Sequence, residues 1–277
     1  MYFQSHVLLL AFGVTILAGL STGIGSLMAF FAKRTSTKFL AVALGFSGGV
    51  MIYVSMIDIF PTAKTALVGT LGDIKGNWIT VIAFFSGMIL AALIDKLVPT
   101  LENPHEPRCI EEMSPDRDNS VKIADTQALM KTGIFAALAI AVHNFPEGVA
   151  TFTATLKNPT IGIAIAVAIA LHNIPEGIAV SVPIYFATGS KRKAFWLSLL
   201  SGMAEPVGAF LAWLVLMPYL SDTLFGILFA GVAGIMVFIA IDELLPASRQ
   251  YGESHLSLYG LLGGMATMAV SMLLFLK

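Results

Sequence analysis

The chain has 277 residues, of which 57% are hydrophobic and only 12% are charged, whereas soluble globular domains carry about 25% charged residues. The 16 Lys and Arg residues nearly balance the 17 Asp and Glu residues, so no basic surface field exists to attract nucleic acid. With a single cysteine in addition, the composition excludes a disordered chain, a nucleic-acid binder and a disulfide scaffold, and it indicates an all-α polytopic membrane protein.

A membrane-spanning helix needs about 20 mostly apolar residues, because the hydrocarbon core is about 30 Å thick. Eight stretches meet this requirement if one acidic residue is allowed in each of three of them. In chain order the expected spans are residues 7–32, 39–57, 76–94, 132–156, 158–190, 194–221, 223–241 and 256–276. The fourth, fifth and sixth spans contain Glu147, Glu176 and Glu205, respectively, as their only charged residues.

Positively charged residues are unevenly distributed between the two sides of this arrangement. The loops after the odd-numbered spans hold twelve Lys and Arg residues, and the opposite side holds four. Because cytoplasmic loops are enriched in Lys and Arg, we expect these loops in the cytoplasm and both termini outside. The expected location is therefore the cell (inner) membrane, with multiple passes through the lipid bilayer.

We expect one transmembrane domain over residues 1–277, with two segments outside its apolar core. Residues 1–5 read MYFQS, which resembles the end of a protease-cleavage tag, so we interpret them as a tag remnant. Residues 99–125 are the longest connection and are expected to form a cytoplasmic loop. This loop is acidic, with only His105 and Cys109 as soft metal ligands, which favours a solvated linker over a metal-binding loop.

The pattern H-N-x-P-E-G occurs twice, beginning at His143 in the fourth span and at His172 in the fifth, 29 residues apart. In each copy the histidine and the glutamate are four residues apart, so Glu147 and Glu176 share a helix face with their histidines. The midpoints of the fourth, fifth and sixth spans coincide with the two motifs and with Glu205. These side chains are therefore expected to meet at the bilayer midplane.

Carboxylates at this depth are costly, at about 2.5–3.5 kcal/mol for each charged side chain on insertion scales. No basic residue lies in the three spans, so either the carboxyl groups are protonated or a cation shares the site. Imidazole, amide and carboxylate groups together suit divalent metals of borderline softness. The candidate ligands are His143, Asn144, Glu147, His172, Asn173, Glu176 and Glu205. Seven donors allow two adjacent ions, whereas one motif alone would favour a structural hydrogen-bonded pair.

The proline and glycine of each motif also favour a transport pathway. Pro146 and Pro175 lack an N–H and would free the carbonyls of Val142 and Leu171. Free carbonyls are tolerated at membrane depth where neighbouring groups or a water-filled cavity satisfy them. The glycine that ends each motif leaves room for a close helix or for a passing ion.

A second internal similarity links the second and seventh spans. Residues 49–61 and 234–246 both read G-x-M-x-aromatic, followed by an acid and a proline at matching places. The two spans cross the membrane in opposite directions, as in the inverted repeats of secondary transporters. We therefore expect an inverted repeat of helices 1–3 and 6–8 around a helix 4–5 hairpin. The alternative is that Gly, Met and aromatic residues recur in any membrane helix.

The two motifs resemble the fourth and fifth helices of the ZIP (Zrt-, Irt-like) metal transporters, and the similarity runs over nearly the whole chain. The resemblance implies eight helices, extracytoplasmic termini and a binuclear metal centre between helices four, five and six. It implies zinc ligands at His143, Glu147, His172 and Glu176. It implies an adjacent position, linked to ferrous iron in one branch of the family, at Asn144, Asn173 and Glu205. It also suggests that Met51 of helix two faces the first site.

Four acidic residues near span ends have two open interpretations. They are transient binding sites along the ion pathway, as the resemblance suggests, or solvated carboxylates that cap helix ends. These residues are Asp58, Asp95, Asp242 and Glu243.

The expected function is uptake of divalent metal cations from outside to cytoplasm, with zinc favoured and iron, manganese, cobalt and cadmium as further substrates. The metal would be cargo, with no cofactor and no enzymatic activity, and no ATP-binding G-x-x-x-x-G-K-[ST] motif is present. One alternative is an intramembrane zinc-dependent hydrolase, although the H-E-x-x-H helix is absent. A second is a carrier of protons or organic solutes that binds no metal. The sequence leaves a homodimer and the coupling ion open.

Overall fold

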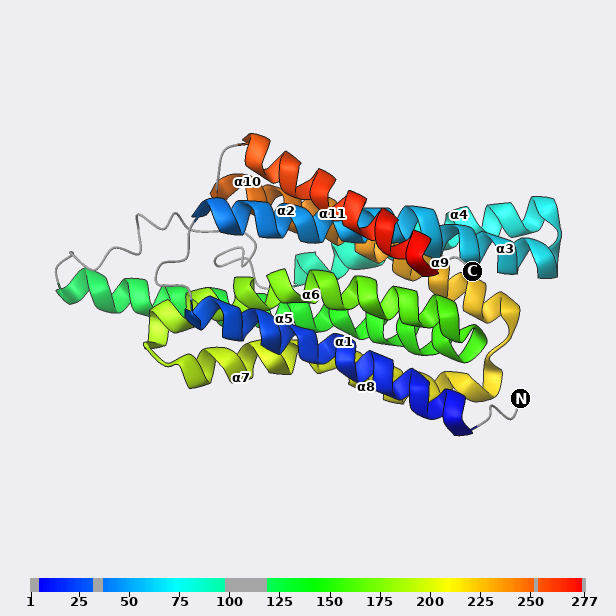
Figure 1. Cartoon of the computed structure of the whole chain (residues 1–277), viewed down its shortest axis with the longest axis horizontal. Helices are drawn as coiled ribbons and strands as arrows, with labels where there is room; N and C mark the ends of the chain where they lie inside the picture. Colours follow the sequence, from blue (N-terminus) through cyan, green and yellow to red (C-terminus); the bar gives the residue numbers. More distant parts are fainter. Residues whose placement is uncertain (1–4, 32–36, 98–118, 252–253, 276–277) are drawn as a thin grey trace.

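The computed structural model describes residues 5–31, 37–97, 119–251 and 254–275, and within these ranges the chain is helical apart from short connections (Figure 1). The elements are α1 (Ser5–Phe31), α2 (Thr37–Val54), η1 (Ser55–Ile59), α3 (Phe60–Leu71), α4 (Asp73–Leu97), α5 (Asn119–Lys157), α6 (Pro159–Thr188), α7 (Lys191–Gly202), α8 (Ala204–Leu211), η3 (Ala212–Leu216), η4 (Met217–Tyr219), α9 (Asp222–Ile239), η5 (Ala240–Leu244), α10 (Leu245–Tyr251) and α11 (Ser254–Phe275).

Seven helical segments of the described chain are long and apolar enough to cross a membrane. They overlap each of the expected spans except the fourth, which lies within α5. The described part of α5 carries His143, Asn144 and Glu147 together with several threonines, and these polar residues lower its hydropathy. Large apolar side chains such as Leu9 and Trp78, 72% and 66% exposed, cover the outside of the bundle, as lipid-facing residues do. The expected all-α, multi-pass membrane fold is confirmed.

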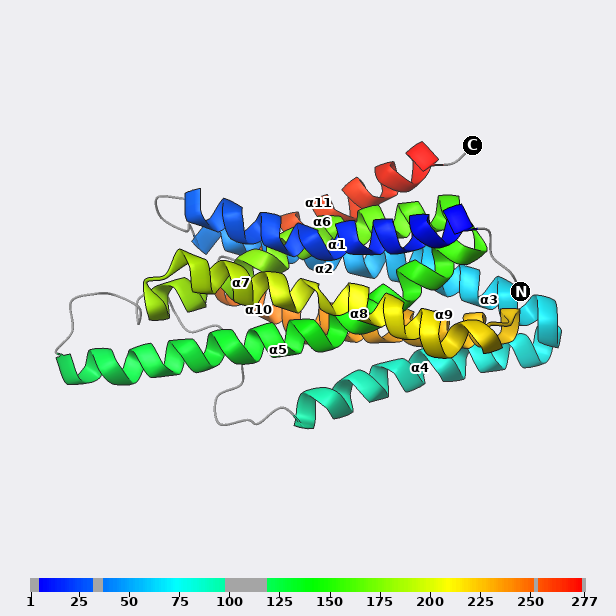
Figure 2. The same cartoon turned by 90° about the horizontal axis from the view of Figure 1, so that it is seen from below.

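The helices form two groups that lie along one long axis (Figures 1 and 2). In one group α6 packs against α1, α5 and α7, and α5 also packs against α8. In the other, α2 packs against α11, and α9 packs against α3 and α4. The closest link between the groups is formed by α2 and α6, so α6, which carries the second motif, lies at the centre of the molecule.

Several helices continue past the charged residues at which the expected spans end. The second expected span ends at residue 57, but the helical segment continues to Leu71. The seventh ends at residue 241, but its segment continues to Arg249. A charged residue ends favourable contact with hydrocarbon, but it leaves backbone hydrogen bonding intact, so it marks depth in the membrane and not the end of the helix.

The same reason applies to the expected loop at 99–125. Helix α5 begins at Asn119, so residues 119–125 of that connection are helical. The rest of that loop, and residues 1–4 of the expected tag remnant, lie outside the described residues.

Two of the long segments contain a π-helical turn at matching positions, η1 and η5. In each, the N–H that follows the turn donates to the carbonyl five residues earlier, which accommodates one extra residue in the helix. The two turns lie 185 residues apart in the sequence, and the fourth residue of each is acidic, Asp58 in η1 and Glu243 in η5. Because the helix continues through both acids, neither caps a helix end.

The sixth expected span is broken near its middle. Helix α7 ends at Gly202, and α8 begins at Ala204 after Met203, whose ψ of −6° departs from helical values. Glu205 therefore lies in the first turn of α8, where the helix dipole favours an acidic side chain.

The two ends of the bundle differ in charge. We call the end at which α1 begins and α11 ends the terminal end, and the opposite one the basic end (Figure 1). Helix ends at the basic end carry Lys38, Lys96, Lys191, Arg192, Lys193 and Arg249. Those at the terminal end carry Lys64, Lys75 and Lys157.

Candidate metal centre

The two motifs lie on the adjacent helices α5 and α6, and their histidines and glutamates pair across the helix interface. His172 Nε2 is 3.2 Å from Glu147 Oε2, which is hydrogen-bond distance. His143 Nε2 is 3.8 Å from Glu176 Oε2, which is too long for a hydrogen bond. The sequence shows that each histidine shares a face with its own glutamate, but only the packing of α5 on α6 shows that each faces the other's.

Asn144, Asn173 and Glu205 complete the cluster, and all three are fully buried. Asn173 Nδ2 donates to Glu205 Oε1, and also to the Ala18 carbonyl of α1 at 3.0 Å. Asn144 Nδ2 donates to the Ser201 carbonyl of α7 at 3.4 Å. The structure therefore brings together all seven residues that the sequence predicted as ligands.

Each of the seven has at least one buried side-chain nitrogen or oxygen without a hydrogen-bond partner in the described structure. These atoms are His143 Nε2, Asn144 Oδ1, Glu147 Oε1, His172 Nδ1, Asn173 Oδ1, Glu176 Oε1 and Oε2, and Glu205 Oε2. No group of three or more His, Cys, Asp or Glu side chains in the described ranges is closed around one point, so the cluster is a set of facing donors and not a cage. A buried polar atom without a partner costs about 1–3 kcal/mol, and a divalent cation bound among these donors would remove that cost.

Glycines allow the helices around the cluster to approach one another. A Cβ on Gly148 would collide with the Glu205 carbonyl oxygen of α8, and one on Gly177 with the Thr22 carbonyl oxygen of α1. Of the two roles expected for these glycines, the structure supports close helix packing.

A small cavity borders the cluster at His143. It has a volume of about 60 Å³ and lies between α4, α5, α9 and η5. His143 lines it, together with Asp95 and Glu243, two of the four acids in question. We call it the His143 cavity. His143 is 6% exposed whereas His172 is fully buried, so the first motif is the more accessible one.

A larger cavity, of about 590 Å³, opens between η1, α3, α5, α6 and α9 at the terminal end. We call it the Asp58 vestibule, because Asp58 lines it beside Lys157 and Asp222, which form an ion pair with each other. Ala154 and Phe225 also line the vestibule, and both belong to the main apolar core.

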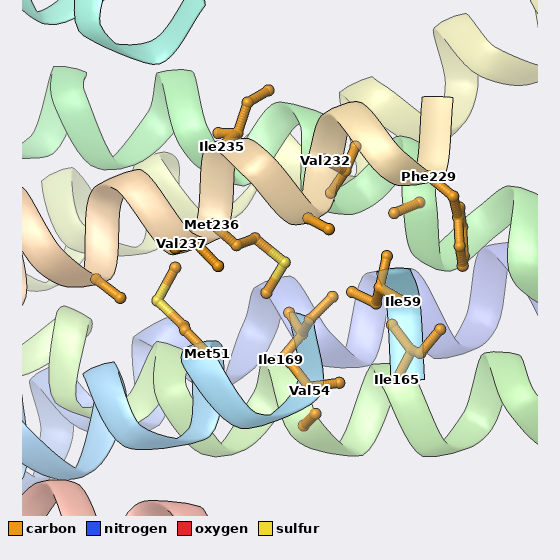
Figure 3. Close-up of a cluster of buried hydrophobic side chains, with 14 of the residues drawn as sticks. Met51, Val54, Ile59, Ile165, Ile169, Phe229, Val232, Ile235, Met236 and Val237 are labelled. Carbon is orange, nitrogen blue, oxygen red and sulfur yellow. The ribbon is translucent and has the colours of Figure 1, made fainter. Parts of the chain in front are cut away.

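The apolar core separates the vestibule from the metal centre. Figure 3 shows Val54 and Ile59 opposite Phe229, with Ile165 and Ile169 of α6 on the remaining side. Ile169 is 1% exposed, and the other four have no exposure. Because Ile169 lies one turn before His172, this apolar layer lies between the vestibule and the second motif.

Met51 lies in the same apolar core. It is fully buried, and its side chain points into the space between α2 and α9, as does that of Met236 (Figure 3). The two methionines are 185 residues apart, like the two π-turns. The suggested contact between Met51 and the first metal site stays a prediction. Asp242, the last of the four acids, is exposed in η5.

Comparison with known proteins also indicates metal transport, and the matches cover nearly the whole chain. A family model described as ZIP Zinc transporter matches residues 5–272. A relative from Lysinibacillus sphaericus, named zinc transporter ZupT, is 62% identical over 267 residues, which are 96% of this chain and 97% of the relative. Proteins with the same name from Oceanobacillus iheyensis and Clostridium perfringens are 62% identical over 271 residues and 58% over 276. These matches cover 96% and 97% of this chain and 98% and 96% of the relatives.

Proposed function

Because the chain belongs to the ZIP zinc transporter family, we propose that it takes up divalent metal cations across the cell membrane, with zinc as the favoured substrate. Iron, manganese, cobalt and cadmium are further substrates in this proposal. The family is one of transporters and not of enzymes, so the hydrolase alternative is dropped, and the metal is cargo that needs no cofactor.

The observation that carries this function is the set of buried, unpartnered donor atoms between α5, α6 and α8. A protein that only had to be stable would pair such atoms with each other. Here His143, Glu147, His172 and Glu176 form the first ion position, and Asn144, Asn173 and Glu205 form the adjacent one. Imidazole with carboxylate suits zinc, and the oxygen-rich second position suits harder ions.

We also propose eight membrane spans in one transporter domain, with helices 1–3 and 6–8 as inverted repeats. The fourth span is the apolar part of α5, which lies beside α6 along the same axis (Figures 1 and 2). The two π-turns support the repeat, since they lie in α2–α3 and α9–α10, which run in opposite directions (Figure 1). Helix pairing supports it too, because α4 packs on α9 as α11 packs on α2.

The basic end would face the cytoplasm and both termini would lie outside. The excess of basic residues at that end supports this orientation. The ion would then pass from the Asp58 vestibule to the centre and leave through the His143 cavity. With the apolar layer closed on the vestibule side, this structure corresponds to a state that communicates with the cytoplasm.

The test is uptake of radioactive zinc into proteoliposomes by the wild type and by Glu176→Ala, with the metal content of both purified proteins measured alongside. We expect zinc to accumulate only in wild-type vesicles and to copurify only with the wild type. Wild-type uptake no greater than that of Glu176→Ala would contradict the proposal.

A further inference from the structure

Three buried side-chain atoms lack a hydrogen-bond partner in the described structure and belong to none of the expected ligands. They are the hydroxyl oxygens of Thr22, Ser55 and Thr151. Thr22 on α1 differs from the other two because its surroundings repeat those of Glu205.

The repetition begins with the two motif asparagines. Asn173 Nδ2 on α6 donates to the Ala18 carbonyl of α1 at 3.0 Å. Asn144 Nδ2 on α5 donates to the Ser201 carbonyl of α7 at 3.4 Å. The two acceptors lie 183 residues apart in the sequence.

The glycines continue the same correspondence. Gly177 of α6 abuts the Thr22 carbonyl oxygen, and Gly148 of α5 abuts the Glu205 carbonyl oxygen. Thr22 and Glu205 are also 183 residues apart. One turn further on, Gly25 abuts α6 and Gly208 abuts α5 at the equivalent motif position, with the same separation. Helix α1 therefore meets the second motif as α7–α8 meets the first, and Thr22 occupies the position that Glu205 occupies in the other half.

No hydrogen bond in the described structure explains why the Thr22 hydroxyl is buried. Buried threonines in helices usually donate to the carbonyl four residues earlier, as Thr15 of the same helix does to Ala11 at 2.8 Å. Thr22 makes no such bond and is fully buried. Its hydroxyl lies against Gly202, at which a Cβ would be 2.5 Å from the oxygen, and Gly202 is three residues before Glu205.

We propose that the Thr22 hydroxyl is a further oxygen donor of the metal centre, at the position formed by Asn144, Asn173 and Glu205. Hydroxyl, amide and carboxylate oxygens are hard donors, so this position would favour manganese and ferrous iron over the softer cadmium. A neutral donor opposite an acidic one also makes the two halves of the centre unequal in charge. This inference rests on the proposed function, because it assigns selectivity to the same centre.

The test compares uptake of manganese and cadmium by Thr22→Val, which keeps the shape of the side chain and removes its oxygen. We expect the ratio of manganese to cadmium uptake to fall by about tenfold, the lower limit for loss of a supporting group at a metal site. Thr22→Ser keeps the hydroxyl and should restore the ratio to within about twofold of the wild type.

Thr15→Val is the matched control, because it removes a buried hydroxyl of α1 that already has a partner. It should leave the ratio unchanged. An unchanged ratio in Thr22→Val, or an equal loss of both metals, would overturn the inference and leave the proposed function standing. Wild-type protein that takes up zinc but neither of these metals would overturn the inference alone, and wild-type protein that takes up none of the three would reject the proposed function. If Thr22→Val does not fold, Thr22→Ala provides the same comparison.

Discussion

The two copies of the H-N-x-P-E-G motif share five of six letters but have different surroundings. The second copy is sealed: His172 is fully buried, its Nε2 is at hydrogen-bond distance from Glu147, and its carbonyl accepts from Ser47 Oγ at 3.2 Å. The first copy is less enclosed: His143 is 6% exposed, lines a cavity and stands 3.8 Å from Glu176. The repeated motif determines which donor groups are present. The packing of the neighbouring helices determines which of these groups an ion contacts as it leaves.

The largest expected effect tests whether the two motif copies form one metal centre. If both glutamates serve one centre, Glu147→Ala and Glu176→Ala should each abolish stabilisation by zinc. In the wild type this stabilisation amounts to about 2.7 kcal/mol at a zinc concentration one hundred times the Kd. Thermal unfolding in detergent, with and without zinc, measures it. A variant that keeps the full zinc shift would show that the copies bind independently.

The next prediction tests the difference in solvent access between the two motif histidines. With Cys109, the single cysteine, replaced by Ser, we would introduce His143→Cys and His172→Cys separately. We expect a water-soluble thiol reagent to modify the first at least about tenfold faster, because a buried thiol meets little solvent. Mass spectrometry of reacted vesicles gives the two rates. Equal rates would contradict the difference in solvent access between the two motif copies.

The glycines provide a test of equivalence between the copies. Gly148→Ala and Gly177→Ala each place a methyl group against a backbone carbonyl oxygen of a neighbouring helix. We expect each to destabilise the protein by about 1–3 kcal/mol, the usual cost of overpacking. Gly69→Ala is the control, since its Cβ would meet no atom within 4 Å. A cost in only one motif variant, measured by denaturation in detergent, would break the correspondence between the halves.

The smallest effect concerns the asparagines. Asn144→Ala removes one long hydrogen bond to a backbone carbonyl, so we expect a loss of about 0.5–1.5 kcal/mol in stability without metal. Asn173→Ala removes bonds to both Ala18 and Glu205 and should cost more. The same denaturation measurement in the presence of chelator ranks the two variants. A larger cost for Asn144→Ala would show that the second copy is not the better anchored one.

Much of the fold was predictable because hydropathy reports directly on membrane depth. Seven of the expected spans overlap helical segments that are long and apolar enough to cross a membrane, and the fourth lies within α5. Helix length was less predictable, since Asp58 and Asp242 stop the apolar run but not the helix. The π-turns left no signal, because one extra residue in a helix changes no local preference.

The candidate site was predictable as a set of residue types and not as a geometry. The cost of burying His143 or Glu147 in a bilayer made them candidates from the sequence alone. The pairing of each histidine with the glutamate of the other helix depends on how α5 packs on α6, which no spacing encodes. Thr22 was missed because a threonine in an apolar helix is ordinary, and only its lack of a partner marks it. Gly19 and Gly25 recur as Gly202 and Gly208, both 183 residues later, and this repeated spacing is the signal that could have found it.

The matched π-turns have a consequence for the ancestry of the molecule. A π-turn accommodates one extra residue in an α-helix, and such turns are rare. Under the proposed repeat, the insertion is older than the gene duplication that produced the two halves. Asp58 and Glu243 would then descend from one ancestral acid, which came to lie nearer to one face or to the other because the two copies were placed in the membrane upside down.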